Sequence, residues 1–220
     1  GQDSSAQYSL SNDLPNTPTL NQLAEQGIVF DNLWVNPVCS PTRATLITGK
    51  YGTKTNVLTP GDSIELDEYI LQEAIKDPEL SAAYNTAIIG KWHLGGTSTM
   101  PNDAGVDHFA GVLGGGVADY FNWTININGQ EQAKDTYTTT EFTNQAIDWV
   151  AEQEQPWFLW LAYNAPHTPF HLPPTDLHNR NLTGDEQDIT RNPRDYYLAA
   201  VEAFDSEIGR LLASMSEDMR

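Results

Sequence analysis

The single cysteine of this chain, Cys39, stands where a reactive or anion-binding residue would be expected. Residues 40–48 form a predicted short helix, with Pro41 in the first turn, where proline is tolerated. The free backbone N–H groups at such a helix start attract anions. Arg43 follows four residues later on the same helical face, and its guanidinium can hold an oxyanion through forked hydrogen bonds. Taken alone, these residues fit equally well a buried cysteine that precedes an ordinary helix.

Three further candidate residues come directly after predicted buried strands. Lys91 and His93 follow the apolar run 86–90, and His167 follows the run 157–163. Lys91 offers a cation to a negatively charged transition state. His93, two residues away in an extended segment, can point the same way and transfer protons. The alternative is a surface lysine, a packed histidine and a turn histidine.

Strands that alternate with helices must bring these residues together. Helix patterns occupy residues 17–27, 40–48, 63–76, 136–152 and 195–215, and strand patterns occupy 28–35, 86–90, 123–129 and 157–163. This order predicts an α/β fold, with a mainly parallel central sheet flanked by helices. Ligands in such folds bind at the carboxyl ends of the strands. Cys39, Lys91 and His167 each follow a predicted strand, so we expect them to share one site.

Composition excludes several classes of function. The 220 residues include 30 acidic and 11 basic side chains, for a net charge of −19, which argues against nucleic-acid binding. No run of eighteen apolar residues predicts a membrane span, and no signal peptide is visible at the N-terminus. A lone cysteine cannot form a disulfide within the chain, and it makes a thiolate zinc site improbable.

Three segments carry a resemblance to a known family. Residues 39–49, beginning Cys-Ser-Pro-Thr-Arg, resemble the first signature of the type I, formylglycine-dependent sulfatases of the alkaline-phosphatase-like superfamily. Residues 88–95, Ile-Ile-Gly-Lys-Trp-His-Leu-Gly, look like the second signature, and residues 165–170, Ala-Pro-His-Thr-Pro-Phe, are similar to a third recurring segment. In that family, a formylglycine-generating enzyme oxidises the cysteine to formylglycine.

The resemblance implies a role for each candidate residue. Cys39, as formylglycine, would be the nucleophile of a sulfuric ester hydrolase that works through a covalent sulfo-enzyme. Arg43 would hold charge near the nucleophile, and Lys91 and His93 would reach the sulfate and the formylglycine hydroxyls. His167 would contact the sulfate and protonate the leaving alcohol. We assign no role to Asp119, and we expect the remaining histidines to be surface or pocket residues: His108, His171 and His178.

The family also implies a divalent cation, usually Ca²⁺, held by two pairs of oxygen ligands. Those pairs would fall before Gly1 and beyond Arg220, so position 39 would be the only metal ligand within these residues. The resemblance therefore suggests that residues 1–220 are an N-terminal catalytic domain, incomplete at both ends and inactive when isolated. A periplasmic or secreted location is the family expectation.

Two alternatives remain open. A phosphonate or phosphate ester hydrolase of the same superfamily would share the fold, the formylglycine and the metal. A non-catalytic homologue would bind a sulfated glycan and keep Cys39 as a thiol. If the protein is a sulfatase, the expected substrate is a sulfated small molecule or carbohydrate.

Overall fold

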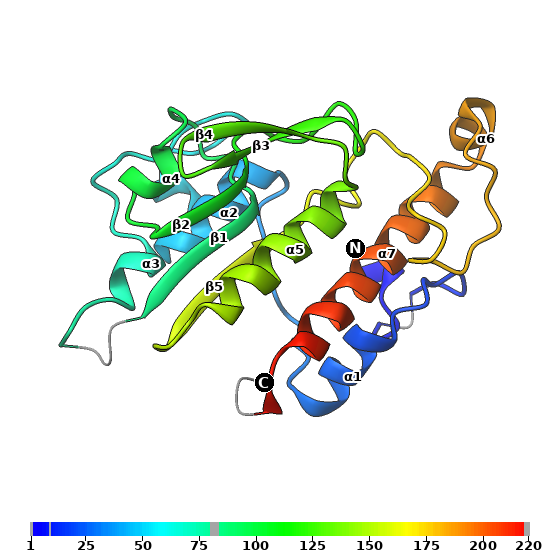
Figure 1. Cartoon of the computed structure of the whole chain (residues 1–220), viewed down its shortest axis with the longest axis horizontal. Helices are drawn as coiled ribbons and strands as arrows, with labels where there is room; N and C mark the ends of the chain where they lie inside the picture. The colour runs from blue at the N-terminus through cyan, green and yellow to red at the C-terminus, as the bar shows by residue number, and fades with distance from the viewer. Residues whose placement is uncertain (1, 9, 80–83, 218–220) are drawn as a thin grey trace.

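The computed structural model describes residues 2–8, 10–79 and 84–217. A five-stranded sheet lies between two layers of helices (Figure 1). The strand order is β4-β3-β2-β1-β5. The strands are β1 (Asn85–Lys91), β2 (His108–Val112), β3 (Trp123–Ile127), β4 (Gln130–Lys134) and β5 (Trp157–Ala162).

The sheet is mixed. Strand β1 pairs in parallel with both β2 and β5, whereas the β2–β3 and β3–β4 pairs are antiparallel. The α/β class and the flanking helices are as predicted. The mainly parallel character holds only around β1, because the β3–β4 hairpin extends one side of the sheet in the antiparallel sense. Asn128 and Gly129 form its turn, both with positive φ, as their sequence predicts.

Helices cover both faces of the sheet (Figure 1). Helices α2, α3 and α4 lie on one face, and α5 lies on the other, with α7 packed beside α5 and α1 beside α7. The helices are α1 (Pro18–Gln26), α2 (Cys39–Thr48), α3 (Leu71–Ala74), α4 (Met100–Asp103), α5 (Thr138–Ala151), α6 (Glu186–Arg191) and α7 (Pro193–Ser214), and two 3-10 turns lie at Gln2–Ser4 and Gly52–Lys54.

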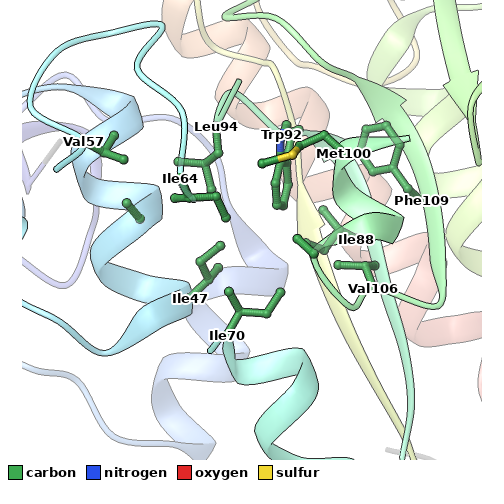
Figure 2. Close-up of a cluster of buried hydrophobic side chains, with 12 residues drawn as sticks. Ile47, Val57, Ile64, Ile70, Ile88, Trp92, Leu94, Met100, Val106 and Phe109 are labelled. Carbon is green, nitrogen blue, oxygen red and sulfur yellow. The ribbon is translucent and has the colours of Figure 1, made fainter. Parts of the chain in front are cut away.

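Strand β1 is the centre of the core. Ile88 faces the cluster beneath α2 and α4, and Ile89 faces the cluster beneath α5; both are fully buried. Figure 2 shows the first cluster, in which Trp92 and Phe109 pack around Ile88. A strand that is covered on both faces has a continuous apolar sequence, and for this reason β1 could be predicted from residues 86–90.

One predicted element is absent, and another is much shorter than predicted. Residues 28–35 form no strand, and Trp34 is 91% exposed. A strand needs a hydrogen-bonding neighbour, and within the described residues no strand pairs with this segment. The predicted helix 63–76 is reduced to α3, because Ile64 instead donates its N–H to the Leu94 carbonyl and packs into the core.

The other predicted elements are present with small shifts at their ends. Strand β5 is less buried than its apolar sequence suggested, because it lies at an edge of the described sheet. Strand β2 was not predicted, since five residues that contain a glycine give little pattern. No helix in the described ranges has the length and apolar character needed to cross a membrane.

Candidate active site

Cys39 is the first residue of α2 and is partly buried. The preceding turn is fixed by Thr42, whose hydroxyl donates to the carbonyl oxygens of Asn36 (3.0 Å) and Val38 (2.9 Å). Val38, at the N-cap, provides no side-chain cap. The first turn of α2 therefore has no side-chain capping acceptor, which suits an anion at this position.

The end of β1 supplies the next two residues. Gly90 has φ +113°, and a Cβ there would lie 2.1 Å from the Ala162 carbonyl oxygen, so only glycine fits. Lys91 follows and is 4% exposed. His93 adopts a left-handed conformation, with φ +54°, and its N–H donates to the Leu113 carbonyl. Its Nδ1 lies 3.1 Å from the Cys39 sulfur.

Arg43 ties α2 to the end of β1. Its guanidinium donates to the Lys91 carbonyl oxygen at 2.6 Å and lies over the Trp160 ring, 5.5 Å from the ring centroid. Its Nε is buried and has no hydrogen-bond partner among the described residues. The arginine thus brings a second buried positive charge beside Lys91.

The site is strongly cationic. Burial lowers the pKa of Arg43 to about 10, and burial together with the Arg43 charge lowers the pKa of Lys91, whereas hydrogen bonding and charge at Cys39 act to raise it. Burial, followed by the charges of Lys91, Arg43 and His167, lowers the pKa of His93 to about 4. No carboxylate contributes to these three shifts. In a protein of net charge −19, such an uncompensated cluster is suited to an anionic ligand.

His167 reaches the same place from the loop after β5 and is exposed. Its N–H donates to the Asn164 carbonyl (2.9 Å), and its Nδ1 donates to the Thr168 carbonyl (2.8 Å), which leaves Nε2 available. The glycine loop after β2 connects the two histidines: a Cβ on Gly115 would touch His93, and one on Gly116 would lie 3.4 Å from His167 Nδ1.

All five candidate residues therefore lie around one region. Hydrogen bonds and mutual charge effects join Cys39, Arg43, Lys91 and His93, and His167 lies across the glycine loop. Asp119 accepts hydrogen bonds from the N–H groups of Phe121 and Asn122, so it has a turn-forming role. His178 is buried rather than at the surface, and its Nδ1 accepts the Arg180 N–H.

The contacts of three residues near His167 were not predicted from the sequence. Tyr120 donates its hydroxyl to the His167 carbonyl at 2.6 Å. His171 stacks on Tyr120 with ring centroids 3.8 Å apart. Asn164 is 3% exposed, and its side-chain amide has no partner among the described residues. Their only sequence signal is proximity to the glycine loop and to the third signature segment.

The described residues do not form a cation site by themselves. No group of three or more His, Cys, Asp or Glu side chains gathers in the described part of the chain in a way that could hold a metal. The groups around Cys39 are cationic, and Asp3 instead pairs with Arg194. Residue 39 could contribute one ligand, and oxygen ligands for a hard cation would have to come from elsewhere.

Comparison with known proteins agrees with this geometry. The chain is 31% identical over 180 residues to arylsulfatase J of Mus musculus, an alignment that covers 71% of this chain and 29% of that protein. The crystal structure of Ps i-CgsB in complex with k-i-k-neocarrahexaose matches with a TM-score of 0.71 and 26% identity, over 90% of this chain and 49% of that one. A phosphonate monoester hydrolase of Agrobacterium radiobacter shares the fold, with a TM-score of 0.61 and 16% identity over 97% of this chain and 56% of that one.

The chain spans 29–43% of the length of the curated relatives it matches. The family model that matches is described as Sulfatase, and the match extends over residues 3–220. Together with the signature residues gathered at the ends of α2, β1 and β5, this match establishes that the chain belongs to the sulfatase family.

Proposed function

We propose that the intact protein hydrolyses a sulfate ester at the site around Cys39. The observation that carries this proposal is the buried cationic pair of Lys91 and Arg43 beside Cys39, with no carboxylate among the groups that shift their pKa values. A sulfate monoester brings one negative charge to this pair. In the transition state, negative charge builds up on the departing oxygen and on the sulfuryl group, where fixed cations stabilise it.

Each side chain then has a separate task. Lys91 and Arg43 hold the sulfuryl oxygens, and the free N–H groups at the start of α2 add to the positive potential. The lowered pKa of His93, about 4, keeps the imidazole neutral at pH 7, so it can accept a proton at position 39. With its Nδ1–H held by the Thr168 carbonyl, the imidazolium form of His167 carries its second proton at Nε2, and it donates that proton to the ester oxygen as the alcohol departs.

Position 39 fits the modification that its motif implies. Oxidation of Cys39 to formylglycine would supply a hydrated aldehyde, with one hydroxyl to attack sulfur and a second to permit release of sulfate. The partly buried side chain, within 3.1 Å of the His93 imidazole, has a proton acceptor at hand. We propose the divalent cation expected from the family only for the intact protein. None of the steps above depends on it.

The substrate we propose is a sulfated carbohydrate. A cavity of about 390 Å³ borders the glycine loop at Gly114 and Gly116 and extends along β3. Its lining includes the polar side chains of Asn122, Thr124, Asn126 and Glu131. The Asn126 amide nitrogen is buried and has no partner among the described residues. These groups suit the hydroxyls of a sugar that carries the sulfate, and the complex of Ps i-CgsB with k-i-k-neocarrahexaose supports this class.

The decisive experiment has two parts and uses protein from its native host. The mass of the tryptic peptide that contains Cys39 should show the deficit expected when CH₂–SH becomes an aldehyde. The intact enzyme should then release sulfate from an aryl sulfate and from sulfated oligosaccharides. An unmodified thiol, in a host that modifies other such motifs, would contradict the enzyme proposal and favour the binding homologue.

The second candidate is a phosphonate or phosphate ester hydrolase. The fold does not separate the two reactions, since the phosphonate monoester hydrolase also matches. Parallel assays with matched aryl sulfate, phosphonate and phosphate esters decide between them. A kcat/KM higher for either phosphorus ester than for the sulfate would overturn the sulfatase proposal.

A further inference from the structure

Tyr120 is joined to the loop that carries His167 although it lies far from it in sequence. It is 2% exposed, and its phenol donates to the His167 carbonyl oxygen at 2.6 Å. Its own carbonyl accepts the N–H of Thr138, the first residue of α5. Burial raises the pKa of the Tyr120 phenol, so it remains a proton donor throughout the neutral range. The hydroxyl therefore provides a permanent link between the rigid helix start and the His167 backbone.

A second aromatic side chain holds the other end of the same loop. His171 stacks on Tyr120, and its Nδ1 donates to the Pro169 carbonyl at 3.0 Å. The Nε2 of this neutral ring then accepts from the Tyr137 hydroxyl, also at 3.0 Å. We call Tyr120, His171 and Tyr137 the aromatic bracket. It holds two carbonyl oxygens of the segment 167–169 from one side.

The His167 imidazole depends directly on this backbone. Its Nδ1 donates to the Thr168 carbonyl, so the orientation of the ring follows the position of the 168–169 peptide. Tyr120 fixes the carbonyl of the 167–168 peptide, which comes directly before it. The ring itself is exposed, and a Cβ on Gly116 would lie 3.4 Å from its Nδ1. Loss of the phenol would therefore change where Nε2 points without removing any group from the reaction.

We propose that Tyr120 is a positioning residue, which aims His167 Nε2 at the leaving-group oxygen of the ester. This inference rests on the proposed function, in which His167 protonates that oxygen. It predicts that Tyr120 matters only when the departing alcohol needs a proton. Acidic phenols leave as phenolate anions with little help from a proton donor. Sugar hydroxyls and alkyl alcohols are poor leaving groups unless they are protonated.

The experiment compares Tyr120→Phe with wild type in the intact protein, using one sulfate ester of an acidic nitrophenol and one of a weakly acidic alcohol. Phenylalanine keeps the ring that stacks on His171 and removes the hydrogen bond. We expect kcat for the weakly acidic alcohol to fall about tenfold, with less than about a twofold change for the nitrophenol ester and little change in KM.

Tyr163→Phe is the matched control. Tyr163 is a partly buried tyrosine, and burial raises its pKa as well, but its hydroxyl pairs with Thr143 on α5 at 2.6 Å, not with the His167 loop. We expect it to change the two esters alike. His167→Ala should by itself slow mainly the ester with the poor leaving group. In this background, Tyr120→Phe should have no further effect, because the side chain that Tyr120 positions is gone.

Equal loss on both esters, no loss on either, or a further loss in the His167→Ala background would overturn the positioning role. These outcomes leave the sulfatase proposal intact as long as wild type turns over. A wild-type protein that hydrolyses neither ester would instead overturn the proposed function and this inference together.

Discussion

Cys39 and Lys91 lie at the ends of regular elements, and His93, just beyond β1, contacts Cys39, whereas His167 lies exposed on a loop whose backbone is held by aromatic side chains. On the first side, the Arg43 guanidinium joins α2 to the β1 backbone at 2.6 Å, and the His93 imidazole lies 3.1 Å from the Cys39 sulfur. On the second side, backbone carbonyls accept hydrogen bonds from His167 itself and from the aromatic bracket.

The difference matches the chemistry that we assign to each side. The sulfuryl group is the same in every substrate, so a rigid, buried pocket for it costs no versatility. The alcohol differs between substrates, and a histidine on an open loop can meet it from the solvent side. We therefore expect changes on the Cys39 side to act on all esters alike, and changes on the His167 side to depend on the leaving group.

The largest effect should follow Cys39→Ala. Removal of the nucleophile position should lower kcat by a factor on the order of 10⁴ or more, to the same extent for every leaving group. Steady-state assays with the two esters described above measure this. Retention of a tenth of the wild-type rate would show that position 39 does not carry the reaction.

Lys91→Ala should come next, with a loss of about 10²- to 10³-fold in kcat that is again independent of the leaving group. Lys50→Ala is the matched control, because Lys50 is an exposed lysine that pairs with Glu68. Its activity should stay within about twofold of wild type. If Lys91→Ala slowed only the ester with the poor leaving group, the two sides of the site would not be separate in the way we propose.

Glycine replacements test the packing of the two sides. Gly90→Ala should destabilise the fold by about 3 kcal/mol or more, because its Cβ would lie 2.1 Å from the Ala162 carbonyl oxygen at φ +113°. Gly116→Ala should cost less than about 1 kcal/mol, since its Cβ would lie 3.4 Å from His167 Nδ1. Urea unfolding of both variants measures this difference, and similar losses would refute it.

The Cys39 side could be predicted from sequence because its signals are local. The anion-binding start of α2, the apolar run of β1 and the residues that follow them are each read from fewer than a dozen positions. The run 157–163 likewise placed His167 at the end of a strand, and the signature resemblance implied its role. Contacts between distant segments could not be read in this way. Tyr120 meets His167 across 47 residues, and nothing in the spacing of either residue indicates that contact.

The errors in the fold have a similar origin. Residues 28–35 have strand-forming composition, but a strand exists only with a partner, and partners are not encoded in the segment itself. Residues 63–70 have acceptable helix propensity, but the buried Ile64 and Ile70 are drawn into the core in an irregular path. Tertiary packing thus overrode local preference in both places.

The smallest expected effect concerns the pH dependence of stability on the His167 side. Burial lowers the pKa of His171, although the Pro169 carbonyl and the nearby Asp119 carboxylate act in the opposite sense. Above about pH 6.5, the usual pKa of an unfolded histidine, the His171 imidazole is neutral in both the folded and the unfolded state, so it does not reduce the stability. As the pH falls, the unfolded chain takes up a proton that the folded bracket resists, so stability decreases.

His171→Asn should remove this contribution. Urea unfolding between pH 7.5 and pH 5 should therefore give a shallower loss of stability in the variant than in wild type. His93 and His108, whose pKa values are also lowered, titrate in both proteins, so the difference between the two slopes isolates His171. Tyr163→Phe should keep the wild-type slope. Equal slopes for wild type and His171→Asn would mean that the His167 loop is held without a neutral His171, and the bracket would then be reduced to the Tyr120 hydrogen bond alone.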